Sequence, residues 1–160
     1  MRDRSGVGHC IRLGSRILDI DGLSYLSYRW GNRSLSHRDR LAGGLTALFD
    51  RALEMSPFDL SITDSHRTIE EHEALPDGAT QVSWEDSKHS TFPSMAGHLD
   101  PYPINYDDWL RYYVLAGVVM AAARDLSMLN RVRWGGDWDR DLNLAEESFR
   151  DLAHWELIDD

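Results

Sequence analysis

Residues 41–63 read LAGGLTALFDRALEMSPFDLSIT, and the period of their apolar residues changes once along the way. From Ser36 onward the apolar residues recur at spacings of three and four, which predicts a helix with one buried face. That face consists of Leu41, Leu45, Leu48, Phe49 and Ala52. Pro57 ends this helix or closely follows its end. Residues 58–63 then alternate apolar and polar side chains, as a half-buried strand does.

Two further helices are predicted on the C-terminal side of this stretch. Thr68, with Glu71 three residues later, forms a capping-box pattern that opens a short helix over residues 69–75. Asp107 or Asp108 can cap a long helix that runs to about residue 126, with carboxylates where the N-terminal helix dipole favours them. Its apolar residues are best explained as core packing.

Short strands fill much of the remaining sequence. Residues 79–105 carry prolines that forbid a long helix, and residues 131–134 and 154–158 have the composition of strands. Helices and short strands that do not alternate strictly predict a single small α+β domain, with a short antiparallel sheet and helices packed around it. We place this domain at residues 31–160 and treat residues 1–30 as an N-terminal extension of unclear role.

Composition excludes several classes of function. A formal net charge of -10 argues against a nucleic-acid partner, because neutralising phosphates needs an excess of Lys and Arg. The single cysteine, Cys10, rules out an internal disulfide and cysteine-rich zinc modules, so a metal would have to bind His and carboxylates. The apolar run over residues 114–123 is too short to insert into a membrane. The N-terminus lacks the apolar segment of a secretory signal, which predicts a cytoplasmic protein.

The histidines are the natural candidates for chemistry. Among the seven, His89, His98 and His154 lie in irregular segments or at strand ends, where site residues tend to gather. Asp151 stands three residues before His154, a spacing that suits a carboxylate base beside an imidazole metal ligand. Taken alone this spacing is weak evidence, since it occurs by chance in many chains.

Six short motifs that occur in one order make the case more specific. They are Ser65-His66-Arg67-Thr68, Ser87-Lys88-His89, Pro93-Ser94-Met95-Ala96, Pro101-Tyr102-Pro103-Ile104, Arg133-Trp134-Gly135-Gly136-Asp137-Trp138 and Asp151-Leu152-Ala153-His154-Trp155-Glu156-Leu157. Together they resemble the phage endolysins of the L-alanyl-D-glutamate peptidase type, which are relatives of bacterial D-alanyl-D-alanine carboxypeptidases and dipeptidases. The resemblance covers roughly residues 31–157.

The resemblance implies a Zn²⁺ ion at the sheet, held by His, Asp and His, with a carboxylate base one helical turn before the last ligand. Carried over to this sequence, His89 is the first ligand, His154 the last and Asp151 the base. Arg67 matches the arginine that contacts the substrate and supports the developing oxyanion. Ser87 matches a serine close to the site, on the substrate side.

The middle ligand departs from the family pattern. Counting back three residues from Pro101 leads to His98, where the family has Asp, whereas Asp100 stands two positions later. Three outcomes compete: His98 completes a three-histidine zinc site, a local shift brings in Asp100, or the protein is no longer an enzyme. We expect His98, because neutral imidazole is a competent zinc ligand and the register of the motif favours it.

From this resemblance we expect a zinc metallopeptidase that hydrolyses the peptide stem of bacterial peptidoglycan, as an endolysin-like L-Ala-D-Glu endopeptidase. We expect it to act as a monomer after release to the cell wall. The alternatives are a D-Ala-D-Ala carboxypeptidase and a catalytically inactive cell-wall-binding or virion-associated relative. No G-x-S-x-G motif of a serine hydrolase is present. Residues 137–143 space their acidic side chains like a calcium loop, but the EF-hand template fails at its sixth and twelfth positions, so we interpret them as a solvated acidic loop.

Overall fold

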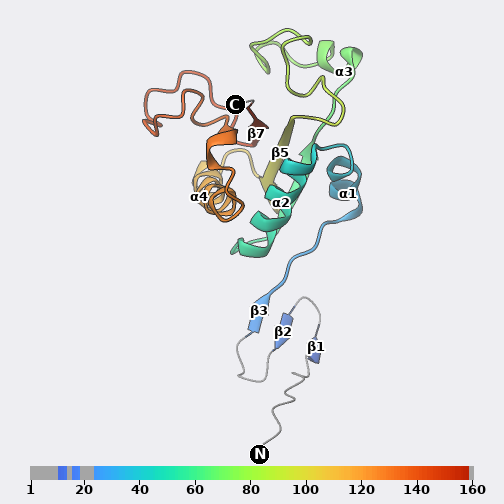
Figure 1. Ribbon diagram of the computed structural model, residues 1–160, viewed down its shortest axis with the longest axis vertical. Helices are drawn as coiled ribbons and strands as arrows, with labels where there is room; N and C mark the ends of the chain where they lie inside the picture. The colour runs from blue at the N-terminus through green and yellow to red at the C-terminus, as the bar shows by residue number, and fades with distance from the viewer. Residues whose placement is uncertain (1–10, 14–15, 19–23, 159–160) are drawn as a thin grey trace, which may run out of the picture.

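The computed structural model describes residues 11–13, 16–18 and 24–158 (Figure 1). Cys10 and the N-terminal segment on which the localisation was predicted lie outside these residues. The first three strands are β1 (Ile11–Leu13), β2 (Arg16–Leu18) and β3 (Ser24–Leu26), and they pair in sequence order as an antiparallel sheet. A second sheet and all the helices follow from residue 32 onward.

The second sheet has four antiparallel strands in the order β4-β5-β7-β6. Their bounds are β4 (Leu60–Asp64), β5 (Ala96–Pro101), β6 (Val132–Trp134) and β7 (His154–Leu157). Helices α2 (Gly43–Met55) and α4 (Trp109–Asp125) contact each other and the sheet. This arrangement confirms the predicted small α+β domain with helices packed around a short antiparallel sheet.

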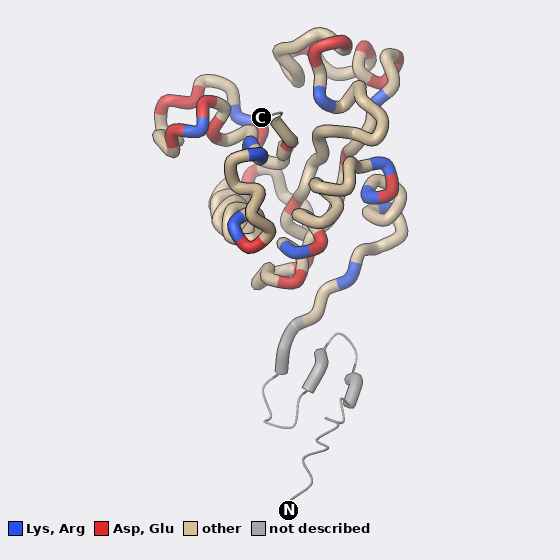
Figure 2. Tube along the Cα trace, in the orientation of Figure 1, with Lys and Arg blue, Asp and Glu red and all other residues tan. Residues whose placement is uncertain are grey.

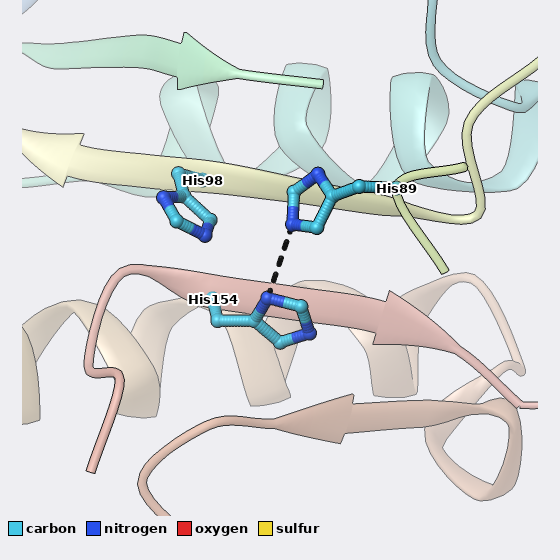
Figure 3. Close-up of side chains that lie close together, drawn as sticks. All are labelled: His89, His98 and His154. Atoms are coloured by element: carbon cyan, nitrogen blue, oxygen red, sulfur yellow. Dashed lines mark hydrogen bonds between the residues drawn. The ribbon is translucent and has the colours of Figure 1, made fainter. Parts of the chain in front are cut away.

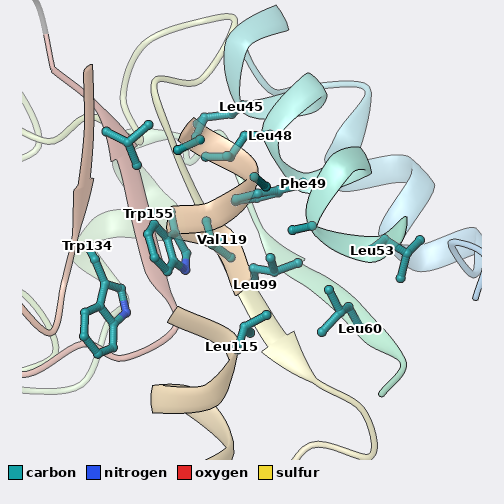
Figure 4. Close-up of a cluster of buried hydrophobic side chains, with 14 of the residues drawn as sticks. Leu45, Leu48, Phe49, Leu53, Leu60, Leu99, Leu115, Val119, Trp134 and Trp155 are labelled. Carbon is teal, nitrogen blue, oxygen red and sulfur yellow. The ribbon is translucent and has the colours of Figure 1, made fainter. Parts of the chain in front are cut away.

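The hydrophobic core lies between these two helices and the sheet (Figure 4). Leu45, Leu48 and Phe49 of α2 are fully buried against it, as are Val119 of α4 and Trp155 of β7. The predicted apolar face of residues 41–52 is therefore the core-facing surface, and all of its members are buried. Burying such side chains is the main stabilising contribution to a domain of this size.

The helix predicted from Ser36 is interrupted. The structure has α1 (Asn32–Arg38) and then α2, with Leu41 between them. The backbone around Leu41 bonds to a distant segment instead of continuing a helix: Ser94 N–H donates to Arg40 O at 2.8 Å, and Ala42 N–H donates to Ser94 O at 2.8 Å. This tertiary pairing competes with helical hydrogen bonds, and the apolar spacing alone does not reveal it.

The other local predictions hold with shifts of a few residues. Helix α3 (Ile69–Glu73) opens with the predicted capping box, in which Thr68 and Glu71 bond reciprocally. Helix α4 begins after Asp108, although no side chain caps it, and a single 3-10 turn, η1 (Leu129–Arg131), leads into β6. No helix among the described residues is long and apolar enough to cross a membrane.

Strand β5 links the core to the site. Side chains alternate between the faces of a strand, so Gly97 and Leu99 share one face while His98 and Asp100 share the other. A side chain at Gly97 would meet Leu41 and Phe49, which places the first face toward α2. His98 therefore projects from the opposite side. The segment that follows α3 and the loop between β6 and β7 line a cavity together with His98. Acidic residues gather in both segments (Figure 2).

Candidate metal centre

Three histidines from separate parts of the chain meet at the sheet (Figure 3). His98 on β5 pairs directly with His154 at the start of β7, and His89 comes from the loop that precedes β5. Each imidazole offers one nitrogen, and these three atoms lie within 4.8 Å of one another. His89 and His154 are buried, at 3% and 7% exposure. The antiparallel register thus brings together residues that are far apart in sequence.

The hydrogen bonds of His89 and His154 fix where their protons lie. His89 Nδ1 lies 2.5 Å from the carbonyl oxygen of Ser65, and His154 Nε2 lies 2.9 Å from Glu156 Oε2. Both partners can only accept, so each imidazole uses its single N–H there. The remaining atoms, His89 Nε2 and His154 Nδ1, face each other at 3.3 Å. In the state in which both imidazoles are neutral, no proton lies between these two atoms.

A cation would resolve this pair of facing lone pairs. Nitrogens that bind one tetrahedral zinc ion at its usual bond length lie roughly 3.3 to 3.4 Å apart. The observed separation of 3.3 Å fits that requirement. Protonation is the alternative, but burial, with smaller contributions from His98 and Arg67, lowers the pKa of His89 well below its ordinary value. The 3.3 Å separation is therefore compatible with a bound metal.

His98 supplies the third nitrogen. Its Nε2 is buried and has no hydrogen-bond partner, although Asp151 Oδ2 lies 3.4 Å away in poor hydrogen-bonding geometry. Desolvation, followed by the neighbouring His154, lowers the pKa of His98 to about 3. Buried polar atoms without a partner are rare in native proteins, and a role as a metal ligand is one explanation for such an atom. The donor set of three neutral imidazoles is one that zinc accepts.

Asp100, the alternative middle ligand, lies outside this cluster. Its carboxylate accepts hydrogen bonds from Thr63 Oγ1 at 2.5 Å and from the hydroxyl of Tyr112 at 2.6 Å. The residue is fully buried, and burial raises its pKa. Both carboxylate oxygens are thus engaged by neighbouring hydroxyls, and it is His98 that the structure places beside His89 and His154.

Asp151 lies beside the cluster because of a close backbone approach. Asp151 N–H donates to Gly135 O at 2.8 Å, and Gly135 N–H donates to His154 O at 2.9 Å. A side chain at Gly135 would come within 2.3 Å of Asp151 O and 3.0 Å of His154 Cβ. Only glycine permits this approach, so the Gly135-Gly136 turn sets the position of both Asp151 and His154.

The two predicted substrate residues lie near the histidines. Arg67 pairs with Asp64: its Nε donates to Asp64 Oδ2 at 2.7 Å, and a second bond comes from its Nη2. Arg67 N–H also donates to the carbonyl oxygen of His89 at 2.9 Å, which ties the arginine to the first histidine. Ser87 is buried, and its hydroxyl accepts from His89 N–H at 3.3 Å.

A cavity of about 210 Å³ opens over this site. Arg67, Ser87 and the three histidines line it, together with Trp138, whose ring centroid lies 5.2 Å from that of His154. Trp134, four residues earlier, is instead buried and stacks on Trp155, with the ring centroids 5.8 Å apart. The structure thus separates one tryptophan at the site from one in the core.

The acidic loop forms a second group of carboxylates. Single oxygens of Asp137, Asp139 and Asp141 lie within 4.8 Å of one another. Asp137 is buried and accepts from the backbone N–H of Asp141 at 3.1 Å, whereas Asp139 and Asp141 are exposed. The backbone of the loop itself thus provides hydrogen bonds to the buried carboxylate.

Glu156 and Asp64, to which the sequence motifs assign no role, support the site. Glu156 accepts from His154 and from Arg133, with Arg133 Nη2 at 2.5 Å. Burial would raise the pKa of Glu156, but these contacts outweigh it and hold the pKa below its ordinary value. Asp64 orients Arg67. In the sequence, these supporting roles are indicated by spacing: Asp64 stands three residues before Arg67, and Glu156 stands two residues after His154.

The fold and the histidine cluster together define a small α+β domain with a candidate metal centre on its sheet. The model of the phage L-alanyl-D-glutamate peptidase family matches residues 26–158, and the chain belongs to this family. This match confirms the resemblance seen in the order of the motifs.

Individual relatives agree with this assignment. The L-alanyl-D-glutamate peptidase of Escherichia phage T5 is 24% identical over 139 residues, which cover 83% of this chain and 100% of that protein. The crystal structure of the Serratia marcescens L-Ala D-Glu endopeptidase ChiX superposes with a TM-score of 0.62 at 22% identity. That match covers 81% of this chain and 90% of the other, and it shows a shared fold.

Proposed function

We infer that the chain is a zinc-dependent peptidase that cleaves the L-Ala–D-Glu bond in the peptide stem of bacterial peptidoglycan. One observation carries this inference: His89 Nε2 and His154 Nδ1 face each other at 3.3 Å, beside the unpartnered Nε2 of His98. The family to which the chain belongs, and the names of its relatives, support the choice of bond.

His89, His98 and His154 would hold the metal where they line the cavity. Three imidazoles with an open position are a known zinc arrangement in hydrolytic enzymes. When bound, zinc supplies a Lewis acid that acidifies water and polarises a carbonyl group. Each histidine offers one nitrogen, and the three atoms lie within 4.8 Å of one another.

The surrounding side chains supply the proton transfers and the charge stabilisation. The Asp151 carboxylate, 3.4 Å from His98 Nε2, accepts the proton of the attacking water and then passes it to the leaving amine. Arg67, oriented by Asp64, donates hydrogen bonds toward the oxyanion that develops on the substrate carbonyl. The Ser87 hydroxyl lines the same cavity and contacts the substrate backbone.

Digestion of purified peptidoglycan by the zinc-loaded protein tests this function. We expect free amino groups to appear, and mass spectrometry to find stem peptides that begin with D-Glu. Release of alanine alone would instead identify a D-Ala-D-Ala carboxypeptidase. Binding to the cell wall without any release would indicate an inactive relative.

The replacement of the family Asp by His98 gives the inactive alternative a specific origin, and His98→Asp tests it. If the wild type binds zinc and cleaves, the three-histidine site is functional. A wild type that neither binds zinc nor cleaves, beside an active His98→Asp variant, would show that the site has degenerated.

A further inference from the structure

A second cavity adjoins the candidate site on the side of Asp151. It measures about 610 Å³ and is lined by Pro76, Tyr106, Trp109 and Tyr112 together with His98 and Asp151. His98 lines this cavity and the one over the three histidines, so the two meet at the candidate metal centre. A substrate that crosses the site therefore has one binding region on each side of the scissile bond.

Two aromatic rings of this second cavity are exposed. Tyr106 is 66% exposed and Trp109 is 55% exposed. Tyr112, in contrast, is buried, and its hydroxyl donates a hydrogen bond to Asp100. Tyr112 therefore belongs to the framework, but Tyr106 and Trp109 present large aromatic surfaces to solvent beside a reaction site. Exposed aromatic residues that line a cavity are typical of ligand contacts, because they offer a rigid apolar face with a polar edge.

The two cavities differ in charge. Arg67, Lys88 and Arg133 line the cavity over the histidines together with the acidic Asp86 and Glu156, so its cations exceed its carboxylates by one. Arg150 and Asp151 line the second cavity and balance each other in charge, and the Arg150 guanidinium donates to the carbonyl oxygens of Leu144 and Ala145. The first cavity thus suits an anionic part of a substrate better than the second, which suits an uncharged part with apolar faces.

The substrate of the proposed function has the same asymmetry. On the D-Glu side of the scissile bond the stem carries a free α-carboxylate and further charged groups. On the L-Ala side the chain continues through an uncharged lactyl amide to the N-acetylmuramoyl sugar. Alanine and the lactyl unit span at most roughly 7 Å, so the sugar must lie immediately beside the site.

We propose that the cavity formed by Tyr106 and Trp109 binds the N-acetylmuramoyl sugar of the substrate, with a sugar face against the Trp109 ring. This inference rests on the proposed function, because it assigns one side of that substrate. A sugar-binding site at this position makes the enzyme selective for stem peptides that are still attached to glycan. It also sets the direction in which the substrate crosses the metal centre.

Two substrates with the same scissile bond test the selectivity: an N-acetylmuramoyl stem peptide and the same peptide with an acetyl group in place of the muramoyl group. We expect the wild type to prefer the first in kcat/KM. Trp109→Ala should lower that preference roughly tenfold, as expected for the loss of one stacked aromatic contact. The control is Leu110→Ala, because Leu110 is 78% exposed and does not line the cavity, and its preference should match the wild type.

A binding measurement separates this inference from the proposed function. N-acetylmuramoyl-L-alanine, which has no scissile bond, is titrated into the full chain by calorimetry, and Trp109→Ala should weaken its binding about tenfold. Weakened binding in a chain that cleaves neither substrate would support the sugar site and remove the peptidase function. If Trp109→Ala lowers kcat/KM equally on both substrates, the D-Glu side of the substrate lies in this cavity. If the variant changes neither the binding of N-acetylmuramoyl-L-alanine nor the substrate preference, the sugar lies outside the cavity. Either result overturns the inference.

Discussion

The Nε2 atom of His154 lies 2.9 Å from Oε2 of Glu156, and Arg133 holds that carboxylate from its other side. This contact turns the Nδ1 atom of His154 toward His89. In metalloproteins a carboxylate commonly orients a histidine ligand and fixes its tautomer in this way. Glu156 is therefore a positioning residue for the candidate metal centre, acting through His154.

Substitution of Glu156 should weaken zinc binding in a graded manner. Glu156→Gln retains an oxygen acceptor but loses the charge, and Glu156→Ala loses both. We expect the zinc dissociation constant to rise from wild type to Gln to Ala, reaching roughly 10- to 100-fold. Competition with a chromogenic chelator measures it, with the exposed Glu85→Gln as control. Equal affinities in all four proteins would remove Glu156 from this role.

Gly135 and Gly117 form a matched pair of glycines. At Gly135 a methyl group would collide with the Asp151 carbonyl oxygen, whereas at Gly117, exposed in α4, it would meet nothing within 4 Å. We expect Gly135→Ala to lower the free energy of unfolding by about 1–3 kcal/mol and to reduce zinc affinity. Gly117→Ala should raise the free energy of unfolding by about 0.5–1 kcal/mol. Urea denaturation measures the free energy of unfolding of both variants. A Gly135→Ala variant as stable as the wild type would contradict the close approach.

The metal-free protein should lose stability as the pH falls. The pKa of His98 is lowered from 6.5 to about 3 in the folded state, so the unfolded chain binds a proton below pH 6.5 that the folded chain excludes. Stability from this group is therefore complete above pH 6.5 and declines toward pH 3, by roughly 1.4 kcal/mol per pH unit. His89, whose pKa is also lowered, adds to the same trend.

Comparison of the chelated wild type with His98→Gln isolates this effect from other titrating groups. Urea denaturation between pH 5 and pH 7 should give a shallower dependence of the unfolding free energy on pH in the variant. Identical slopes in the two proteins would show that His98 takes up protons in the folded state as readily as in the unfolded chain.

The order of the elements and much of the site could be predicted from local sequence. The capping box of Thr68 and the buried face of α2 follow from residue spacing, because they depend on contacts within one turn or one helix face. The break at Leu41 does not follow from spacing, since it arises from pairing with Ser94. Local pattern carries no information on such long-range hydrogen bonds.

In the site, too, some features follow from local sequence and others depend on long-range contacts. The motif order singled out His89, Asp151 and His154, but the register between β5 and β7 is what brings His98 opposite His154. The distinction between His98 and Asp100 likewise rests on Thr63 and Tyr112, which engage the aspartate from other elements. Those partners lie 37 and 12 residues away in sequence, beyond any motif.

Asp151→Asn separates metal binding from proton transfer. The amide keeps the size of the side chain but cannot accept the proton of water, so we expect full zinc content with turnover reduced roughly 10²- to 10⁴-fold. Atomic absorption and peptidoglycan digestion measure the two quantities. Turnover near the wild-type level would assign the base to another group.

Anomalous scattering at the zinc edge tests the metal centre most directly. Crystals of the zinc-loaded protein should give one strong peak bounded by His89 Nε2, His98 Nε2 and His154 Nδ1, with Asp100 still bonded to Thr63 and Tyr112. A peak coordinated by Asp100, or no peak between His89 and His154, would contradict the three-histidine site.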